Sequence, residues 1–242
     1  MIDCRLLTGL YGKEVDMVLI SETSDWRMAH PGAVIGLLEL SGVENADTYP
    51  RLNDRKRETE AHLRERYQGF TRQEILSLPV MSAYKQYYKR FKKTYHVLLQ
   101  VESIALKGKK LPNISPLVDS NFIAELETFV LTAGHDVEKL QEPILIDVSR
   151  EGDQITQMNG VCKPIRAGDM IMRDAHSVSC SILYGQDNRS PISRETSHVL
   201  FVAYAPNGVP AEIVEAQLRK IEDNIRLFSP KTIVEQHQLI LA

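Results

Sequence analysis

The sequence predicts an α+β protein, with all 242 residues forming a single domain. Short apolar segments bounded by turn residues, which are typical of β-strands, occur towards both ends of the chain. The middle of the chain instead repeats its apolar residues with the period of an α-helix. No internal repeat, low-complexity tract or flexible linker separates these parts, so we expect the strands and helices to share one core.

The first part of the chain predicts two strands and one long helix. Residues 14–21 and 33–41 are short, apolar and bounded by turn residues, so both are predicted to be strands. Between them, residues 25–32 end in His-Pro-Gly and are predicted to form a loop. Residues 52–67 are strongly charged, and their sparse apolar positions predict an exposed helix.

Three helical segments follow. Residues 71–74 begin with Thr and end with Glu, the spacing of a capping box, which predicts the start of a short helix. Pro79 is predicted to begin a second helix, and residues 97–107 repeat the helical period until Gly108. One face of the second helix is aromatic: Tyr84, Tyr88, Phe91 and Tyr95. We expect this face to pack in the core, with stacking on RNA bases as the alternative.

A rigid turn with two prolines leads into the next helix. Leu111 and Ser115 each precede a proline, which disfavours the α region for both. Ser115 is predicted to cap a helix that starts at Pro116, where the missing N–H costs nothing. We expect this helix to continue through Ala133 and to end at Gly134.

The last hundred residues return to strands and end in a helix. The predicted strands are residues 143–148, 170–172, 178–184 and 198–204. From Pro210, apolar residues at helical spacing predict an amphipathic helix that reaches Phe228.

The composition favours a protein of the reducing cytoplasm. The content of 43% hydrophobic and 25% charged residues is ordinary for a globular protein. No apolar run is as long as a membrane span, so we expect no membrane partner, and the first five residues lack the features of a secretion signal. The three cysteines, Cys4, Cys162 and Cys180, cannot all pair with one another.

A basic segment interrupts an otherwise acidic chain. Residues 85–110 hold eight Lys or Arg and one acid, a net charge of +7, so the other residues sum to −10. This asymmetry predicts a localised anionic partner, with a solvated lysine-rich helix face as the alternative. The candidate RNA-binding residues are Lys85, Tyr87, Lys89, Arg90, Lys92, Lys93 and Lys110. Tyr87 is included because it lies off the aromatic face and is the better candidate for stacking on a base.

No motif for nucleophilic, phosphate or dinucleotide chemistry is present in the sequence. Cys162, His176 and Cys180 lack a Cys-x-x-Cys pair, so we expect neither a metal site nor a cofactor. Residues 184–193 are dense in polar groups between two predicted strands. They are predicted to form either a solvated hairpin loop or the rim of a pocket.

Three segments resemble the B3/B4 domain of the phenylalanyl-tRNA synthetase β subunit. Residues 111–121, Leu-Pro-Asn-Ile-Ser-Pro-Leu-Val-Asp-Ser-Asn, are similar to the segment that opens that domain. Residues 150–160 with 167–175 resemble its second block, and residues 196–202 resemble its last core strand. The resemblance extends over residues 88–205. It implies a free-standing B3/B4-like domain with a mixed sheet core, a helical middle segment, an N-terminal extension (1–87) and a C-terminal helix with a tail (206–242).

The resemblance also implies a substrate pocket. Its candidate residues are Asn113, Asp119, Asn121, Asp187, Arg189, Thr196 and Val202. In the family this pocket accepts tyrosine wrongly attached to tRNA, and an acidic residue binds the tyrosine hydroxyl. That acidic residue aligns with Val202, whose side chain cannot accept a hydrogen bond, so we expect poor hydrolysis of tyrosine-charged phenylalanine tRNA. His135 follows Gly134 too closely to match the family's histidine securely.

The function implied by the resemblance is binding of tRNA or aminoacyl-tRNA. Hydrolysis of a mischarged aminoacyl ester in trans would need little beyond positioning of the labile ester and a water molecule. The alternative is a non-catalytic module that binds an amino-acid-like small molecule or a protein. Both interpretations remain open on the sequence.

Overall fold

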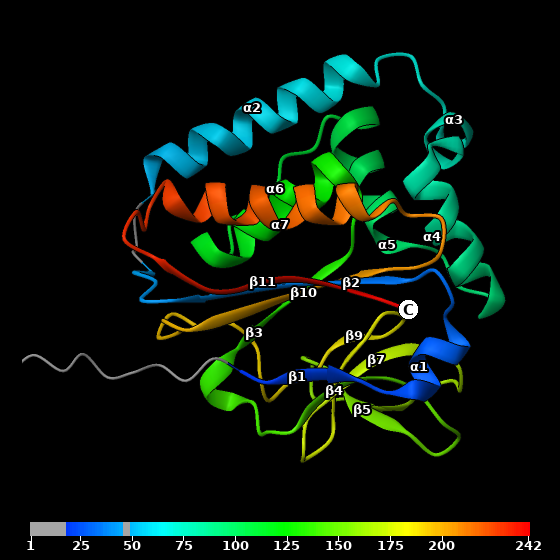
Figure 1. Cartoon of the computed structure of the whole chain (residues 1–242). Coiled ribbons are helices and arrows are strands. Elements are labelled where there is room, and N and C mark those ends of the chain that lie inside the picture. Colours follow the sequence, from blue (N-terminus) through cyan, green and yellow to red (C-terminus); the bar gives the residue numbers. More distant parts are fainter. Residues whose placement is uncertain (1–17, 46–48) are drawn as a thin grey trace, which may run out of the picture.

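The computed structural model describes residues 18–45 and 49–242, and Figure 1 shows its layered arrangement. A central sheet has four antiparallel strands in the order β11 (Ile233–Leu241), β2 (Val34–Ser41), β10 (Val199–Ala205) and β3 (Thr132–Asp136). Every residue of β2 and β10 is buried. Both strands are covered on their two faces, which explains their continuous apolar sequences.

A second sheet lies below the central sheet in Figure 1. Its order is β1 (Ile20–Glu22), β4 (Ile144–Val148), β7 (Met170–Arg173), β8 (Val178–Ser181) and β9 (Gly185–Gln186). The β1–β4 pair is parallel and the other pairs are antiparallel. A small hairpin of β5 (Gln154–Thr156) and β6 (Cys162–Pro164) packs beside β8.

Helices cover the opposite face of the central sheet (Figure 1). They are α2 (Pro50–Arg66), α6 (Pro116–Thr128) and α7 (Ala211–Arg226), with α3 (Arg72–Ser77), α4 (Pro79–Arg90) and α5 (His96–Val101) at one end. The remaining helical elements are α1 (Ser24–Ala29), a π-helical turn (Glu102–Leu106) and a 3₁₀ turn (Val137–Lys139). Gly36 of β2 lets α7 approach closely, because a Cβ there would meet Val214 Cγ1 at 2.7 Å. The mixed sheet with its helical middle confirms the predicted α+β class.

Most predicted elements are present. The strands predicted at 33–41, 143–148 and 198–204 and the helix predicted at 52–67 are confirmed. The capping box is also confirmed: the Thr71 hydroxyl accepts the Glu74 N–H, and the Glu74 carboxylate accepts the Thr71 N–H. Of the strand predicted at 14–21, residues 14–17 lie outside the described residues, and β1 begins at Ile20. Among the described helices, none is long and apolar enough to cross a membrane.

Two predictions of local structure are wrong, and one strand was not predicted. The segment predicted as a loop at 25–32 contains α1, which Thr23 caps and whose Trp26 side chain is completely buried. The helix predicted to reach Ala133 ends at Thr128, because Phe129 adopts the left-handed conformation (φ 63°) and the chain turns into β3, which contains Gly134. Strand β11 was not predicted, since its partly exposed, polar sequence lacks the pattern of a buried strand.

The aromatic face of α4 joins the helical layer to both sheets. The Tyr84 and Tyr95 rings stack with centroids 4.1 Å apart, and both side chains are buried. The Tyr84 hydroxyl donates to the Tyr204 carbonyl of β10 (2.7 Å), whereas the Tyr88 hydroxyl donates to the Ile182 carbonyl after β8 (2.5 Å). Core packing is therefore the correct interpretation of this face, and it fixes the space between the two sheets.

Candidate functional site

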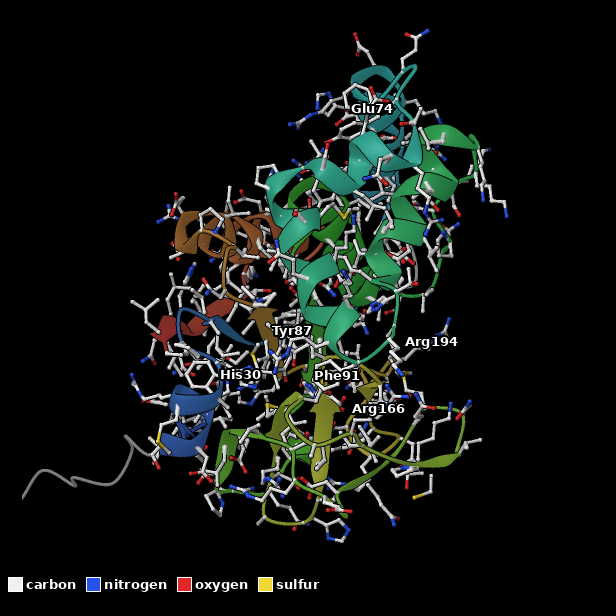
Figure 2. The ribbon with its side chains drawn as sticks, turned by 90° about the vertical axis from the view of Figure 1, so that its right-hand side faces the viewer. His30, Glu74, Tyr87, Phe91, Arg166 and Arg194 are labelled. Atoms are coloured by element: carbon white, nitrogen blue, oxygen red, sulfur yellow. The ribbon has the colours of Figure 1, made fainter. Side chains whose placement is uncertain are left out.

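A cavity of about 580 Å³ lies where α6 meets the edge strand β3 and the β8–β9 region of the second sheet. Its apolar lining residues include Val118, Phe122, Leu131, Ile182, Ile192 and Phe201. Arg194 also lines it, and Figure 2 shows this residue between the helical layer and the second sheet. The volume suits a ligand of a few tens of atoms or fewer.

The cavity wraps around the edge of the central sheet. Three consecutive residues of β3, Thr132 to Gly134, line it, and side chains alternate between the faces of a strand. Both faces of β3 therefore contribute. Gly134 lets the lining residues Ile192 and Phe201 pack directly against β3, because a Cβ there would meet Ile192 Cδ1 at 2.6 Å and Phe201 Cε1 at 2.9 Å.

Several polar side chains in the lining are committed to internal hydrogen bonds. The Asn121 amide donates to the Thr132 carbonyl (2.9 Å) and accepts from Gln217 (3.3 Å). The Gln186 amide donates to the carbonyls of Gly134 (2.8 Å) and Ser190 (2.9 Å). The Ser181 hydroxyl donates to the buried Asp169 carboxylate. These groups shape the wall of the cavity and have little capacity left for a ligand.

Two buried lining groups retain capacity for hydrogen bonds. One Glu125 oxygen accepts the Thr132 N–H (2.8 Å), and burial raises the pKa of this carboxyl group to about 8 even though Thr132 and Asn121 act in the opposite direction. The Tyr204 hydroxyl is buried beside the Cys180 thiol, which is a weak hydrogen-bonding group, and no nitrogen or oxygen atom of the described residues binds it. At neutral pH the cavity therefore holds a largely protonated carboxyl group and a phenol.

The lining also contains no readily ionised thiol. Burial raises the pKa of Cys180 to about 12, so its side chain stays protonated under physiological conditions. Within the described part of the chain, no three His, Cys, Asp or Glu side chains form a cluster suited to a metal ion.

The structure separates the predicted pocket residues. Asn121 lines the cavity, whereas Asn113 and Asp119 instead bind the buried Lys56 ammonium, at 2.6 Å and 2.7 Å. Val202 is completely buried in β10 and does not line the cavity; Tyr204, two residues further along the same face, does.

The other three predicted pocket residues brace the loop between β9 and β10. Asp187 accepts the Ser190 hydroxyl (2.7 Å), and Arg189 forms an ion pair with Asp174 (2.9 Å). Thr196 accepts the Ser193 N–H (2.9 Å), and Ser193 lines the cavity. These residues hold the rim of the cavity in place without facing it.

His135 belongs to the same internal network. Its Nδ1 lies 2.8 Å from Ser190 Oγ, whose proton goes to Asp187. Burial lowers the pKa of His135 to about 3, so the imidazole is neutral. The three residues are completely or almost completely buried, which excludes a nucleophile accessible to a ligand.

The structure places the predicted RNA-binding residues in different surroundings. Lys85, Lys89, Arg90 and Lys92 are exposed on α4 and just after it. Tyr87 is buried instead, with its hydroxyl donating to Asp169 (2.7 Å), so its ring is not available for stacking on a base. Lys110 lies away from α4, because the N–H of the next residue, Leu111, donates to Glu60 of α2.

At the end of α4, basic residues from elsewhere in the chain extend the basic segment that the sequence predicted. Arg166 donates to the Phe91 carbonyl, and Figure 2 shows these two residues side by side. Burial lowers the pKa of Lys93 despite the opposing charge of Asp169, and the positive charges of Arg166 and Lys163 lower it further. We call Lys89, Arg90, Lys92, Lys93, Lys163 and Arg166 the basic surface.

The basic surface adjoins the cavity. Lys93 donates to the Leu183 carbonyl (3.1 Å), and the preceding residue, Ile182, lines the cavity. Its ammonium lies 3.5 Å from the centroid of the Tyr184 ring, which precedes the lining residue Gly185.

Comparison with known families decides the classification. The family model of the B3/4 domain matches residues 81–222, more than half of the chain. The chain belongs to the B3/4 domain family. The matched region contains the cavity residues of α6, β3, β8 and β10 and the whole basic surface, and it confirms the resemblance found in the sequence.

This B3/4 domain is also similar to a solved structure, an N-terminal fragment of the phenylalanyl-tRNA synthetase beta-subunit from Pyrococcus horikoshii. The two share 8% sequence identity with a TM-score of 0.46, and the similarity covers 94% of this chain and 57% of that fragment. No curated protein sequence matches the chain.

The sequence predicted Asn121 but not the two lining groups of this B3/4 domain that retain hydrogen-bonding capacity, Glu125 and Tyr204. Glu125 gave a weak signal, since it is an acid within a mostly apolar helix, between Ile123 and Leu126. Tyr204 gave none, because its sequence neighbours are those of any buried strand.

Proposed function

We propose that this B3/4 domain binds the aminoacyl end of an aminoacyl-tRNA in the cavity and hydrolyses the ester in trans. The observation that carries the proposal is the juxtaposition of a largely apolar cavity with a basic surface at its edge. An aminoacyl-tRNA has matching parts: a compact amino acid joined to a chain of phosphates. Such a partner would place the protein in the cytoplasm.

The basic surface would hold phosphates near the 3′ end of the RNA. It combines lysines and arginines from the end of α4 with Lys163 and Arg166, which lie more than 70 residues further along the chain. Neutralisation of phosphates releases counterions, which favours binding at low salt. The acceptor end could then enter the cavity past Arg194, which belongs to its lining.

Hydrolysis in this cavity would depend on positioning. Water would add to the ester carbon, the bond to the ribose oxygen would break, and that oxygen would take up the proton lost by the water to become a hydroxyl group. The Ser181 hydroxyl already donates to Asp169 and the Cys180 thiol stays protonated, which favours attack by water over a covalent intermediate.

The same observation supports binding without turnover as the second candidate. A cavity whose hydroxyl and thiol groups are not activated is sufficient for a module that recognises an amino-acid-like molecule. The two functions differ in one result, namely whether charged tRNA is hydrolysed faster than it decays spontaneously.

The test is single-turnover deacylation of a panel of aminoacyl-tRNAs. Val118→Trp should fill the cavity from α6 and abolish turnover, whereas Leu99→Trp alters an exposed residue of α5 outside the lining and should leave it unchanged. If no aminoacyl-tRNA is hydrolysed above its spontaneous rate but one is still bound, the second candidate is correct. Equal turnover by the two variants would remove the cavity from the reaction.

A further inference from the structure

The cavity contains one acid whose placement suggests selectivity among ligands. Glu125 lies on α6, only 2% exposed, with its carboxyl group among the cavity's lining groups. Around it the walls are largely apolar, and the amides of Asn121 and Gln186 and the hydroxyl of Ser181 are committed to the protein. A carboxyl group kept in such a place without a cation beside it is costly unless a ligand uses it.

The hydrogen bonds of Glu125 leave room for a ligand. The Thr132 N–H binds one oxygen at 2.8 Å, and the Asn121 amide is the other neighbour that bonds to the carboxyl group. The described residues place no Lys or Arg against it, because the cations that bind α6, Lys56, Arg55 and Lys220, pair with Asp119 or Glu127. Two carboxyl oxygens offer about four acceptor positions, or one donor and the rest as acceptors when protonated.

We propose that Glu125 determines the specificity of the cavity and selects an amino-acid side chain that ends in an uncharged oxygen, a hydroxyl or an amide. This inference rests on the proposed function. A protonated carboxyl group donates to such an oxygen and can also accept from it. An apolar side chain of the same shape leaves Glu125 without that partner, whereas an anionic side chain would meet Glu125 in a poorly solvated site.

Val202 does not decide this selectivity. Its inability to accept a hydrogen bond led to the expectation of poor hydrolysis of tyrosine-charged phenylalanine tRNA, but Val202 lies outside the lining. The polar character of the cavity comes from a different element, α6, and from Tyr204.

The selectivity should depend on pH, because Glu125 holds its proton at neutral pH and loses it around pH 8. The titratable groups near it are the phenols of Tyr84, Tyr88, Tyr95 and Tyr204, the thiol of Cys180, the imidazole of His96 and, behind Ser181, the Asp169 carboxyl group. Burial raises the pKa of the phenols and of the thiol and lowers that of His96, and it raises the pKa of Asp169 to about 6. Between pH 7 and pH 9, Glu125 is therefore the group here that changes charge.

The test measures binding of non-hydrolysable 3′-aminoacylamino-adenosines in matched pairs: threonyl with valyl, tyrosyl with phenylalanyl, and asparaginyl with leucyl. At pH 7 the protein should prefer the oxygen-bearing member of at least one pair by tenfold or more, and this preference should fall at least several-fold at pH 9. Glu125→Gln should keep the preference and lose its pH dependence, because the amide still donates but does not titrate. Glu125→Leu should remove the preference at both pH values while binding of the apolar member persists.

The control is Glu127→Gln on the same helix, since Glu127 pairs with Arg55 and Lys220 outside the lining. It should leave both the preference and its pH dependence unchanged. If the protein binds these compounds but Glu125→Leu retains the preference, or if no pair shows one, the inference is wrong and the proposed function stands. If none of the compounds binds, the proposed function fails with it.

Discussion

Replacement of Asp119 by alanine should strongly destabilise the protein, because the Asp119 carboxylate is the acidic partner of a buried ammonium. Lys56 of α2 is 4% exposed, and its Nζ donates to Asp119 Oδ2 (2.7 Å), Asn113 Oδ1 (2.6 Å) and the Pro112 carbonyl (2.5 Å). The other Asp119 oxygen accepts the Ile114 N–H (3.1 Å). One ion pair thus ties the two-proline turn to α2 and to the start of α6.

The size of this destabilisation follows from the hydrogen-bond partners that the Lys56 ammonium keeps. In Asp119→Ala the ammonium keeps two neutral acceptors but loses its counter-charge, and the Ile114 N–H loses its acceptor. Removal of one partner from a buried pair costs about 3–5 kcal/mol. For a chain of this size, that corresponds to a fall in Tm of roughly 6–20 °C. The double change Lys56→Met with Asp119→Leu removes both charges and should recover most of the loss.

Urea and thermal denaturation measure these differences. Asp54→Ala is the matched control, since Asp54 forms a pair with Arg57 on the same helix as Lys56 but both side chains are exposed, at 68% and 73%. Its effect should stay within about 0.5 kcal/mol. If Asp119→Ala is no more destabilising than Asp54→Ala, or if the double change is worse than the single one, the reasoning about this buried pair is refuted.

Three further outcomes are expected. Folding keeps Glu125 protonated up to about pH 8, whereas an exposed glutamate ionises near pH 4.5. The free energy of unfolding should therefore fall as the pH rises between these two values. Glu125→Gln should therefore stabilise the protein by roughly 1 kcal/mol at pH 5 and roughly 4 kcal/mol at pH 7.5 in denaturation experiments, and an equal effect at both would contradict the burial of an ionisable group. Replacement of Lys89, Arg90, Lys92 and Lys93 by alanine should weaken tRNA binding and flatten its dependence on salt, measured by titration at several salt concentrations; an unchanged slope would exclude these residues from the RNA surface. Gly134→Ala should destabilise the protein by about 1–3 kcal/mol and weaken ligand binding, because the new methyl group collides with Ile192 and Phe201, and a neutral result would show that β3 moves freely there.

Local chemistry made much of the fold predictable. The start of α6 depends on Ser115 and Pro116, which are adjacent in sequence, and the capping box depends on Thr71 and Glu74 alone. The end of α6 is different. An apolar run continues past Phe129, and the helix stops there because the following residues pair with β10 and the Thr132 N–H binds back to Glu125. The end of α6 therefore depends on a strand some 70 residues further along the chain, and no local sequence pattern predicts it.

The candidate site was less predictable than the fold, because a polar side chain can either bind a ligand or form hydrogen bonds within the protein. Asp187 and Arg189 are as polar as residues that bind a ligand, but Ser190 and Asp174 occupy their side chains. Glu125 is the opposite case. The sequence places this acid inside a helix, but its surroundings depend on how α6 packs against β3. The basic surface was half visible in the sequence, since Lys163 and Arg166 reach the end of α4 only through the fold.

The central claim is that the cavity recognises the amino acid and the basic surface recognises the RNA. The most direct measurement compares the affinity of an acceptor-stem RNA that carries a non-hydrolysable aminoacyl amide with that of the same RNA uncharged. We predict that the amino acid raises the affinity tenfold or more in the wild type and in Leu99→Trp, and that Val118→Trp loses this gain while still binding the uncharged RNA. Equal affinities for charged and uncharged RNA, over the full set of amino acids, would contradict the account.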